Sequence, residues 1–240
     1  MLNNDLDVDH WKRQLALRTR LQIPDFLQAP AAEFLRDCLM RQVPWRLAER
    51  SDDGAARTHG HDDALDADGY RRVLDAAYQG ARDGFRFVYD SYMLGRARAE
   101  GWDPDLPLHG LFDFLNSPDY LEFARYLTGD AAINAVNAQA TRYRPGQFLT
   151  AHDDKNSLEG RRYAYVINLS PRWKAEWGGQ LQFLDAQGHV IDTLLPRWNT
   201  LSIFKVPQLH HVSLVSPWAG EHRLAITGWM LARDAQAGWS

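Results

Sequence analysis

Two histidines and an aspartate are the side chains of this sequence best suited to hold a metal ion. His152 and Asp154 are separated by one residue, and two adjacent histidines, His210 and His211, follow later in the chain. In an extended strand, residues two apart leave the same face of the sheet, so the first imidazole and carboxylate would lie side by side. A histidine from another strand would complete a site with two imidazoles and one carboxylate on one side of a metal, leaving the other positions open. The sequence therefore predicts a metal site that is also the catalytic centre.

The third ligand has two candidates. Neighbouring residues of a strand point to opposite faces, so only one of His210 and His211 can bind the same metal as His152. The histidine that does not bind would be a surface residue or a hydrogen-bond partner of a ligand.

An arginine near the end of the chain points to an anion in the same pocket. On an alternating strand Arg223, Ala225 and Thr227 share one face, whereas Leu224 and Ile226 share the other. Burying an unpaired guanidinium is costly, and its planar fork suits a carboxylate that binds through both oxygens. We therefore expect Arg223 to bind a carboxylate within a pocket lined by small residues.

Five short motifs, in this order, resemble the 2-oxoglutarate and Fe(II)-dependent oxygenases, and specifically their prolyl hydroxylase-like branch. The motifs lie within residues 137–231 and read Tyr143-x-Pro145-Gly146, His152-x-Asp154, Trp177-Gly178-Gly179, His210-x-Val212 and Arg223-x-Ala225-Ile226-Thr227. The order and the spacing together are specific. The His-x-Val match favours His210 over His211 as the third ligand.

The resemblance implies a set of ligands and their positions. Fe(II) would be held by His152, Asp154 and His210 near the open end of a double-stranded β-helix, with 2-oxoglutarate chelating the metal and ascorbate as a candidate reductant. Arg223, deeper in the barrel, would hold the far carboxylate of 2-oxoglutarate. Tyr143 would donate a hydrogen bond to this co-substrate, and Thr227 would support the same carboxylate. A core aromatic side chain and an ordinary strand threonine are the competing interpretations of Tyr143 and Thr227.

The reaction implied by the resemblance is hydroxylation of an unactivated C–H bond, with release of succinate and CO2. The Trp-Gly-Gly segment and the His-x-Val motif favour a prolyl residue of a peptide or protein as the substrate. Hydroxylation of a free amino acid or another small metabolite is an alternative within the same chemistry. A cupin-like metal-binding module without oxygenase activity is an alternative from another class, and Arg223 argues against it because such a module needs no carboxylate clamp.

The elements that must position these residues change in character near residue 134. Helical periodicity predicts helices over residues 9–20, 29–41, 70–82 and 111–127, with a short strand at 43–47 and a mobile loop at 51–69. Runs of β-branched and aromatic residues then predict eight strands, at 137–143, 148–154, 162–169, 179–183, 190–193, 200–204, 210–215 and 222–232.

These elements predict an α+β fold. Its core would be a double-stranded β-helix, or jelly roll, over residues 134–232, preceded and buttressed by a mostly helical support region over residues 1–133. A tail would follow over residues 233–240. We expect one compact unit, because 240 residues with 45% hydrophobic side chains fit one large domain.

Composition excludes few partners and leaves the oligomeric state open. The formal charge of −4 and pI near 6.1 give no reason to expect nucleic acid or an anionic membrane. The polar, acidic N-terminal stretch lacks the basic start and apolar run of a secretory signal, and no apolar run is long enough to cross a bilayer. Cys38 is the single cysteine. These features lead us to expect a cytoplasmic protein whose substrate is a peptide, a protein or a small molecule.

Overall fold

The computed structural model describes residues 1–51, 53–60, 65–156 and 158–233. The helices in this part of the chain are α1 (Val8–Arg18), α2 (Ala29–Arg41), α3 (Ala67–Gly80), α4 (Leu94–Glu100), α5 (Leu108–Leu115), α6 (Pro118–Thr128) and the 3-10 helix η1 (Ala175–Trp177). The strands are β1 (Arg20–Ile23), β2 (Arg46–Arg50), β3 (Ala56–Thr58), β4 (Phe87–Met93), β5 (Ala135–Val136), β6 (Gln139–Tyr143), β7 (Phe148–His152), β8 (Arg161–Asn168), β9 (Leu181–Leu184), β10 (Val190–Leu194), β11 (Thr200–Lys205), β12 (His210–Val212) and β13 (Arg223–Leu231).

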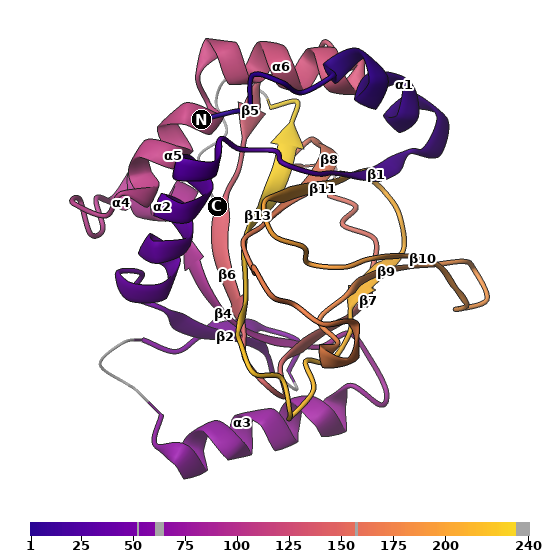
Figure 1. The fold of residues 1–240 in the computed structure, drawn as a ribbon. Coiled ribbons are helices and arrows are strands. Elements are labelled where there is room, and N and C mark those ends of the chain that lie inside the picture. Colours follow the sequence, from indigo (N-terminus) through magenta and orange to yellow (C-terminus); the bar gives the residue numbers. More distant parts are fainter. Residues whose placement is uncertain (52, 61–64, 157, 234–240) are drawn as a thin grey trace.

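These strands form one antiparallel sheet that curls into a nearly closed barrel (Figure 1). Neighbours follow the order β1-β11-β8-β13-β6-β4-β7-β12-β9-β10, with β2 and β3 attached beside β4, and β5 beside β13. The two ends of this order, β1 and β10, are joined by side chains. Arg20 on β1 bonds through Nε to Asp192 on β10 at 2.8 Å, and the Gln22 side chain donates to the carbonyl oxygen of Leu195 at 2.7 Å.

The alternating side chains of the central strand β8 separate two packed regions. Tyr163 and Ile167 belong to the main hydrophobic core, which also takes in buried residues of α1, α2, α5 and α6. Ala164 and Val166 point to the other face, into the barrel, where they pack with Phe183 and Phe204. The helices thus pack against the outside of the barrel. The barrel interior holds a smaller hydrophobic cluster and a cavity.

The first half of the chain also contributes strands to the barrel wall. β4 pairs with β7 through its first residues and with β6 through its second half, both along one edge, while β2 occupies the other edge, so β4 spans two strands that follow each other in sequence. Buried Asp90 on β4 accepts from Arg142 at 2.7 Å and from Arg144 at 2.8 Å, which fixes β4 against β6 and the turn that follows it. The sequence did not predict β1, β4 or α4, because β4 meets its partners only across a long sequence separation and its face alternation was not recognised.

The predicted helices agree with the structure except at one break. Residues 29–41 form α2 with the predicted bounds, and helices near 9–20 and 70–82 are present with shifted ends. The single helix predicted at 111–127 is wrong, because the chain forms α5 and α6 separated at Asn116 and Ser117. Ser117 caps α6 by accepting from the backbone N–H of Tyr120, and Pro118 occupies the first turn, where its missing N–H is harmless.

The eight predicted strands are all present, although several ends differ. The strand predicted at 148–154 ends at His152, and the strand predicted at 210–215 ends at Val212. The strand predicted at 43–47 lies at Arg46–Arg50 instead.

The loop predicted at 51–69 contains β3 and the first turn of α3. Residues 52 and 61–64 of that loop, and residues 234–240 of the predicted tail, lie outside the described residues. Within the described chain, no helix combines the length and apolar character needed to span a membrane.

Candidate metal centre and co-substrate pocket

A cavity of about 440 Å³ opens inside the barrel. Its walls come from β4, β6, β7, β8, β12 and β13, and the three predicted metal ligands and Arg223 are among its lining residues. Strand alternation places these side chains inward, because every second residue of a curled sheet faces the barrel interior. The size suits a small organic ligand.

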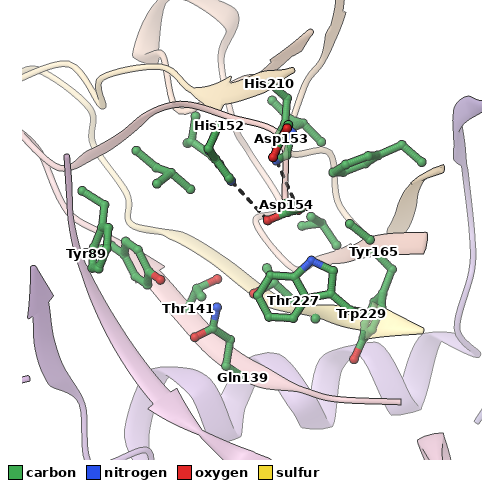
Figure 2. Close-up of a pocket in the computed structure, with 18 of the residues that line it drawn as sticks. Tyr89, Gln139, Thr141, His152, Asp153, Asp154, Tyr165, His210, Thr227 and Trp229 are labelled. Carbon is green, nitrogen blue, oxygen red and sulfur yellow. Dashed lines mark ion pairs between the residues drawn. The ribbon is translucent and has the colours of Figure 1, made fainter. Parts of the chain in front are cut away.

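The three predicted metal ligands meet at one end of the cavity (Figure 2). His152 ends β7 and His210 begins β12, and the two residues are direct partners across these antiparallel strands. Nε2 of His152 lies 3.4 Å from Oδ1 of Asp154, and Nε2 of His210 lies 3.5 Å from Oδ2. One ligand atom from each residue lies within 4.8 Å of the others. One metal ion can therefore contact all three side chains.

Asp154 reaches this cluster by a different route from the predicted one. β7 ends at His152, so the carboxylate is not presented by continued strand alternation. Asp154 instead has φ of 60°, in the left-handed region that aspartate tolerates better than most residues. This backbone conformation turns the side chain back toward the histidines. The His-x-Asp spacing was therefore informative although the strand geometry inferred from it was wrong.

The backbone holds both histidines in the tautomer that a metal requires. Nδ1 of His152 lies 3.0 Å from the carbonyl oxygen of Thr150, and Nδ1 of His210 lies 2.7 Å from that of Gln208. A carbonyl can only accept, so each Nδ1 carries the proton and each Nε2 presents its lone pair to the cluster.

The pKa values of the cluster also fit a metal. Burial, followed by the nearby His152, lowers the pKa of His210 to about 4. Burial alone would raise the pKa of Asp154, but its hydrogen bond with His152 and the two neighbouring imidazoles lower it below the ordinary value. At neutral pH the site thus offers the neutral imidazole of His210 and the ionised carboxylate of Asp154, both of which suit divalent iron.

His211 points away from this cluster. It is paired with Gln182 on β9 and is only partly buried. Its neighbour His210, by contrast, is 4 % exposed and faces Asp154. The geometry places His210 rather than His211 among the potential ligands.

Arg223 lies at the start of β13 with no partner for its charge. The residue is 2 % exposed, and within the described chain its Nε has no hydrogen-bond partner and its guanidinium forms no ion pair. The guanidinium carbon lies 5.0 Å from the centre of the Tyr143 ring, on the strand paired with β13. Burial lowers the pKa of Arg223 from its ordinary value. A buried, unpaired cation that lines a cavity fits an anionic ligand, as a dicarboxylate co-substrate would supply.

The Trp-Gly-Gly segment forms part of the wall beside Arg223. A side chain at Gly179 would begin 3.2 Å from Cδ of Arg223 and 3.1 Å from the Trp173 ring. A side chain at Gly178 would collide with the backbone oxygen of Leu214. Both glycines also have positive φ. The segment therefore lets the chain pass close to Arg223 without filling its space.

Tyr143 and Thr227, the other two residues predicted to bind the co-substrate, lie in different parts of the cavity. Tyr143 is buried, lines the cavity beside Arg223 and stacks on Tyr89 with ring centres 5.0 Å apart. Thr227 lines the cavity too, and its buried hydroxyl has no hydrogen-bond partner among the described residues. It is four residues from Arg223 on one strand, roughly 13 Å at the usual rise, so the two residues do not reach one carboxylate. Thr227 lies toward Trp229 and the metal end instead (Figure 2).

Several lining residues escaped the sequence reasoning. Phe87 and Tyr89 of β4, and Phe85 two residues before this strand, line one wall of the cavity. Their alternate spacing was a detectable signal of a strand that faces the barrel. Arg161 and Trp229 line the opposite wall beside Asp154, and no motif indicated them.

Comparisons with known proteins agree with this geometry. Residues 138–231 match the model of the 2OG-Fe(II) oxygenase superfamily. Prolyl 3-hydroxylase OGFOD1 from Xenopus laevis is 33% identical over 128 residues, which cover 50% of this chain and 24% of that protein. The chain therefore spans about a quarter of the length of this curated relative.

Solved structures share the fold at low sequence identity. A prolyl-4-hydroxylase from Pseudomonas putida is similar with a TM-score of 0.58 at 19% identity, covering 93% of this chain and 98% of that one. A prolyl hydroxylase from Trichoplax adhaerens, in complex with a hypoxia inducible factor oxygen degradation domain peptide fragment, is similar with a TM-score of 0.59 at 14% identity, covering 94% and 89%. The barrel is thus the jelly-roll core of these oxygenases. Residues 138–231, which carry the candidate metal triad and Arg223, are thus similar to the 2OG-Fe(II) oxygenase superfamily.

Proposed function

We propose that this protein is an Fe(II)- and 2-oxoglutarate-dependent dioxygenase that hydroxylates a prolyl residue of a peptide or protein. The observation that carries the proposal is the pairing of two features in one cavity. A cluster of two imidazoles and a carboxylate lies at one end of the cavity. Buried Arg223, whose Nε has no hydrogen-bond partner in the described chain, lines the same cavity. The first feature suits a metal and the second suits a carboxylate ligand, so the cavity fits both required groups.

The residues have separate tasks in this proposal. His152, Asp154 and His210 would hold Fe(II), and Arg223 with Tyr143 would hold the far carboxylate of 2-oxoglutarate. When bound, the metal and this co-substrate supply the oxidising power for C–H hydroxylation, with succinate and CO2 as products. The chain itself fixes the ligand geometry, keeps His210 neutral and excludes bulk water from the barrel interior.

An aromatic wall supports a substrate with an apolar ring. The Phe85 ring centre lies 5.4 Å from that of His152 and 6.0 Å from that of Phe87. Both phenylalanines line the cavity and are only partly buried, so their faces are accessible. A prolyl ring packed on this wall would lie beside the metal cluster. The similarity to prolyl hydroxylases, one of them bound to a peptide, supports the same substrate class.

The two alternatives predict different behaviour. A hydroxylase of a free amino acid or small metabolite would use the same metal and co-substrate but would not need a peptide. A cupin-like metal-binding module would bind metal without consuming 2-oxoglutarate. The unpaired charge of Arg223 argues against the second alternative, because its burial costs free energy and serves no metal-binding purpose.

One assay tests the proposal. The protein would be loaded anaerobically with Fe(II), then supplied with 2-oxoglutarate, oxygen and a panel of proline-containing peptides. Succinate and the gain of one oxygen atom by the peptide would be measured. We expect both to depend on the proline, with the same peptides carrying alanine at that position as controls. Turnover of free proline but of no peptide would favour the small-metabolite alternative. No succinate under any condition, together with no visible absorbance that depends on both iron and 2-oxoglutarate, would overturn the proposal.

A further inference from the structure

A stacked arginine and tryptophan lie directly beside the carboxylate of Asp154. Arg161 is the first residue of β8, and Trp229 lies on β13, the neighbouring strand. The guanidinium carbon of Arg161 is 3.5 Å from the centre of the Trp229 ring. This distance is well inside the limit of about 6 Å for a cation–π interaction. The Arg161 side chain is 16% exposed. The two side chains therefore form a tightly packed pair at the rim of the cavity.

Both members of the pair present N–H groups to Asp154. Nη1 of Arg161 lies 3.6 Å from Oδ1 of Asp154 and 3.4 Å from its backbone oxygen. Nε1 of Trp229 is buried without a hydrogen-bond partner in the described chain, and the indole nitrogen points toward the Asp154 carboxylate (Figure 2). Glu159 accepts from Nε of Arg161 at 2.8 Å. The guanidinium is thus held from both sides, by the indole face and by Glu159.

Asp154 needs such partners for two physical reasons. Its side chain is 8% exposed, so a carboxylate oxygen that does not bind metal would be buried with unused acceptor capacity, which is costly unless donors are near. Its backbone is left-handed, at φ of 60°, and lies just beyond the end of β7, where no ladder hydrogen bonds hold it. The orientation of this ligand must therefore come from contacts of its own side chain.

We propose that Arg161 and Trp229 are positioning residues that hold Asp154 so that it binds the metal through one oxygen only. The guanidinium lies nearest to Oδ1 and the indole nitrogen points toward the same carboxylate, so the two donors would occupy Oδ1 and leave Oδ2, which faces His210, to the metal. This inference rests on the metal centre of the proposed function. It assigns to the metal end of the cavity a role distinct from that of Arg223, since it acts on the metal ligand and not on the co-substrate.

Two substitutions with matched controls test the proposal. Trp229→Phe keeps an aromatic ring and removes the N–H, and Arg161→Gln removes the charge and the stacking. Arg162→Gln is the control for arginine, because Arg162 is the next residue of β8 and forms its own ion pair with Asp130 at 2.6 Å. Trp218→Phe is the control for tryptophan, because Trp218 is 68% exposed. Thermal unfolding of each metal-free variant would establish that it is folded.

Binding of Mn²⁺, followed by loss of the free-ion signal in electron paramagnetic resonance, is the first measurement. We expect Trp229→Phe and Arg161→Gln to bind Mn²⁺ roughly 10- to 100-fold more weakly than the unsubstituted protein, the usual cost of losing a partner of a metal ligand. The visible spectrum of the Co²⁺-loaded protein is the second measurement, because it reports the number and geometry of the ligands. We expect it to change in both variants and in neither control, and Arg161→Lys to recover part of the affinity through its charge.

The outcomes separate this inference from the function on which it rests. If the unsubstituted protein binds no Mn²⁺, both the metal centre and the positioning role are overturned. If it binds Mn²⁺ while Trp229→Phe and Arg161→Gln match it in affinity and in Co²⁺ spectrum, the positioning role alone is overturned. Should Arg161→Gln fail to fold, Trp229→Phe decides together with Glu159→Gln, which releases the guanidinium without removing it. Unchanged affinity in those two variants would likewise contradict the proposal.

Discussion

Asp154 shows how much a single backbone conformation contributes to the metal centre. Its carboxylate lies 3.4 and 3.5 Å from the two histidine nitrogens, on a backbone with φ of 60° that turns the side chain toward them. Aspartate and asparagine tolerate this region better than alanine does, because their short polar side chains bond locally. Charge and backbone preference are therefore two separable properties of this residue.

Asp154→Asn and Asp154→Ala separate these properties. Both substitutions remove the charged ligand, so we expect both to abolish tight Mn²⁺ binding. Only the alanine variant also loses the tolerance for positive φ, so its free energy of unfolding should be lower than that of the asparagine variant by roughly 1 kcal/mol. Urea denaturation of the metal-free proteins measures this difference. Equal stabilities would show that the left-handed backbone is not a constraint at this position.

We expect Arg223 to lower the free energy of unfolding and to raise the affinity for 2-oxoglutarate. Its buried Nε has no hydrogen-bond partner in the described chain. Arg223→Met removes the buried charge and keeps a side chain of similar length. We expect the metal-free variant to be at least as stable as the unsubstituted protein in urea denaturation. Its affinity for 2-oxoglutarate, measured by calorimetry with Mn²⁺ bound, should fall roughly 10- to 100-fold, as expected for losing a charge-assisted hydrogen bond.

The control for Arg223→Met is Arg172→Met, at a side chain that is 80% exposed. It should leave the affinity for 2-oxoglutarate unchanged. Loss of Mn²⁺ affinity in Arg223→Met would mean that the arginine supports the metal cluster and not the co-substrate.

The depressed pKa of His210 makes the stability of the metal-free protein depend on pH. In the folded state burial lowers this pKa to about 4, whereas in the unfolded chain it returns to about 6.5. Between these values the unfolded state binds the extra proton, so the free energy of unfolding falls as pH is lowered from about 6.5 to about 4. The Asp154 carboxylate remains ionised in this window, since its pKa is lowered.

Denaturation at several pH values tests this dependence. The slope of unfolding free energy against pH should be shallower in His210→Gln than in the unsubstituted protein. His189→Gln, at a side chain that is 78% exposed, is the control and should retain the slope. An unchanged slope in His210→Gln would contradict the burial argument.

At the scale of elements, the Trp-Gly-Gly segment matters for the space it leaves empty. Gly179 has φ of 62°, and a side chain there would press on Arg223 and Trp173. Gly188 in the β9–β10 turn has a similar φ of 84° but nothing within 4 Å of an added Cβ. The two glycines thus share a backbone requirement and differ only in what surrounds them.

Gly179→Ala and Gly188→Ala form a matched pair of substitutions. Both should lose roughly 1 kcal/mol of unfolding free energy, because alanine is strained at positive φ. Only Gly179→Ala should also weaken 2-oxoglutarate binding, since its methyl group displaces the Arg223 side chain. Calorimetry on both variants measures this, and equal affinities would show that the segment does not shape the co-substrate pocket.

The sequence predicted those elements whose signals are local. The eight strands after residue 134 and the helix at 29–41 follow from periodicity and turn residues, and the triad and Arg223 follow from motifs on those strands. β4 and the break before Pro118 were missed because long-range pairing and a side-chain cap decided them. Arg161 and Trp229 were missed because only the folded sheet brings β8 and β13 together beside Asp154.

At the scale of the molecule, the barrel is closed between β1 and β10 by side chains and not by a backbone ladder. Arg20 joins Asp192 and also donates to Gln208 at 3.0 Å, and its guanidinium lies 4.9 Å from the centre of the Phe183 ring. Edge strands held in this way keep unpaired backbone groups and open more readily than strands in the middle of a sheet.

We expect Arg20→Ala to weaken the contact between β1 and β10 without unfolding the protein. The loss of unfolding free energy should stay within about 1 kcal/mol, since the ion pair is partly exposed. Amide hydrogen exchange in β10 should become faster, because the strand loses its link across the barrel. Arg98→Ala removes a more exposed ion pair, with Asp113, on the helical side, and should leave exchange in β10 unchanged. Unaltered exchange in Arg20→Ala would mean that β10 is held by its pairing with β9 alone.

The pairing of β4 with both β6 and β7 has a consequence for how the protein is made. β6 and β7 are separated by a short turn in sequence, yet each pairs with the same edge of β4, a strand synthesised some fifty residues earlier. During translation β4 must therefore wait for both partners to leave the ribosome, and the histidine of β7 reaches its place only when this long-range pairing forms. A gene fragment that encodes only residues 138–231 would supply the three candidate metal ligands and Arg223 but not the strand against which β6 and β7 are aligned. The candidate metal centre is thus a product of both halves of the chain, although its motifs lie in only one.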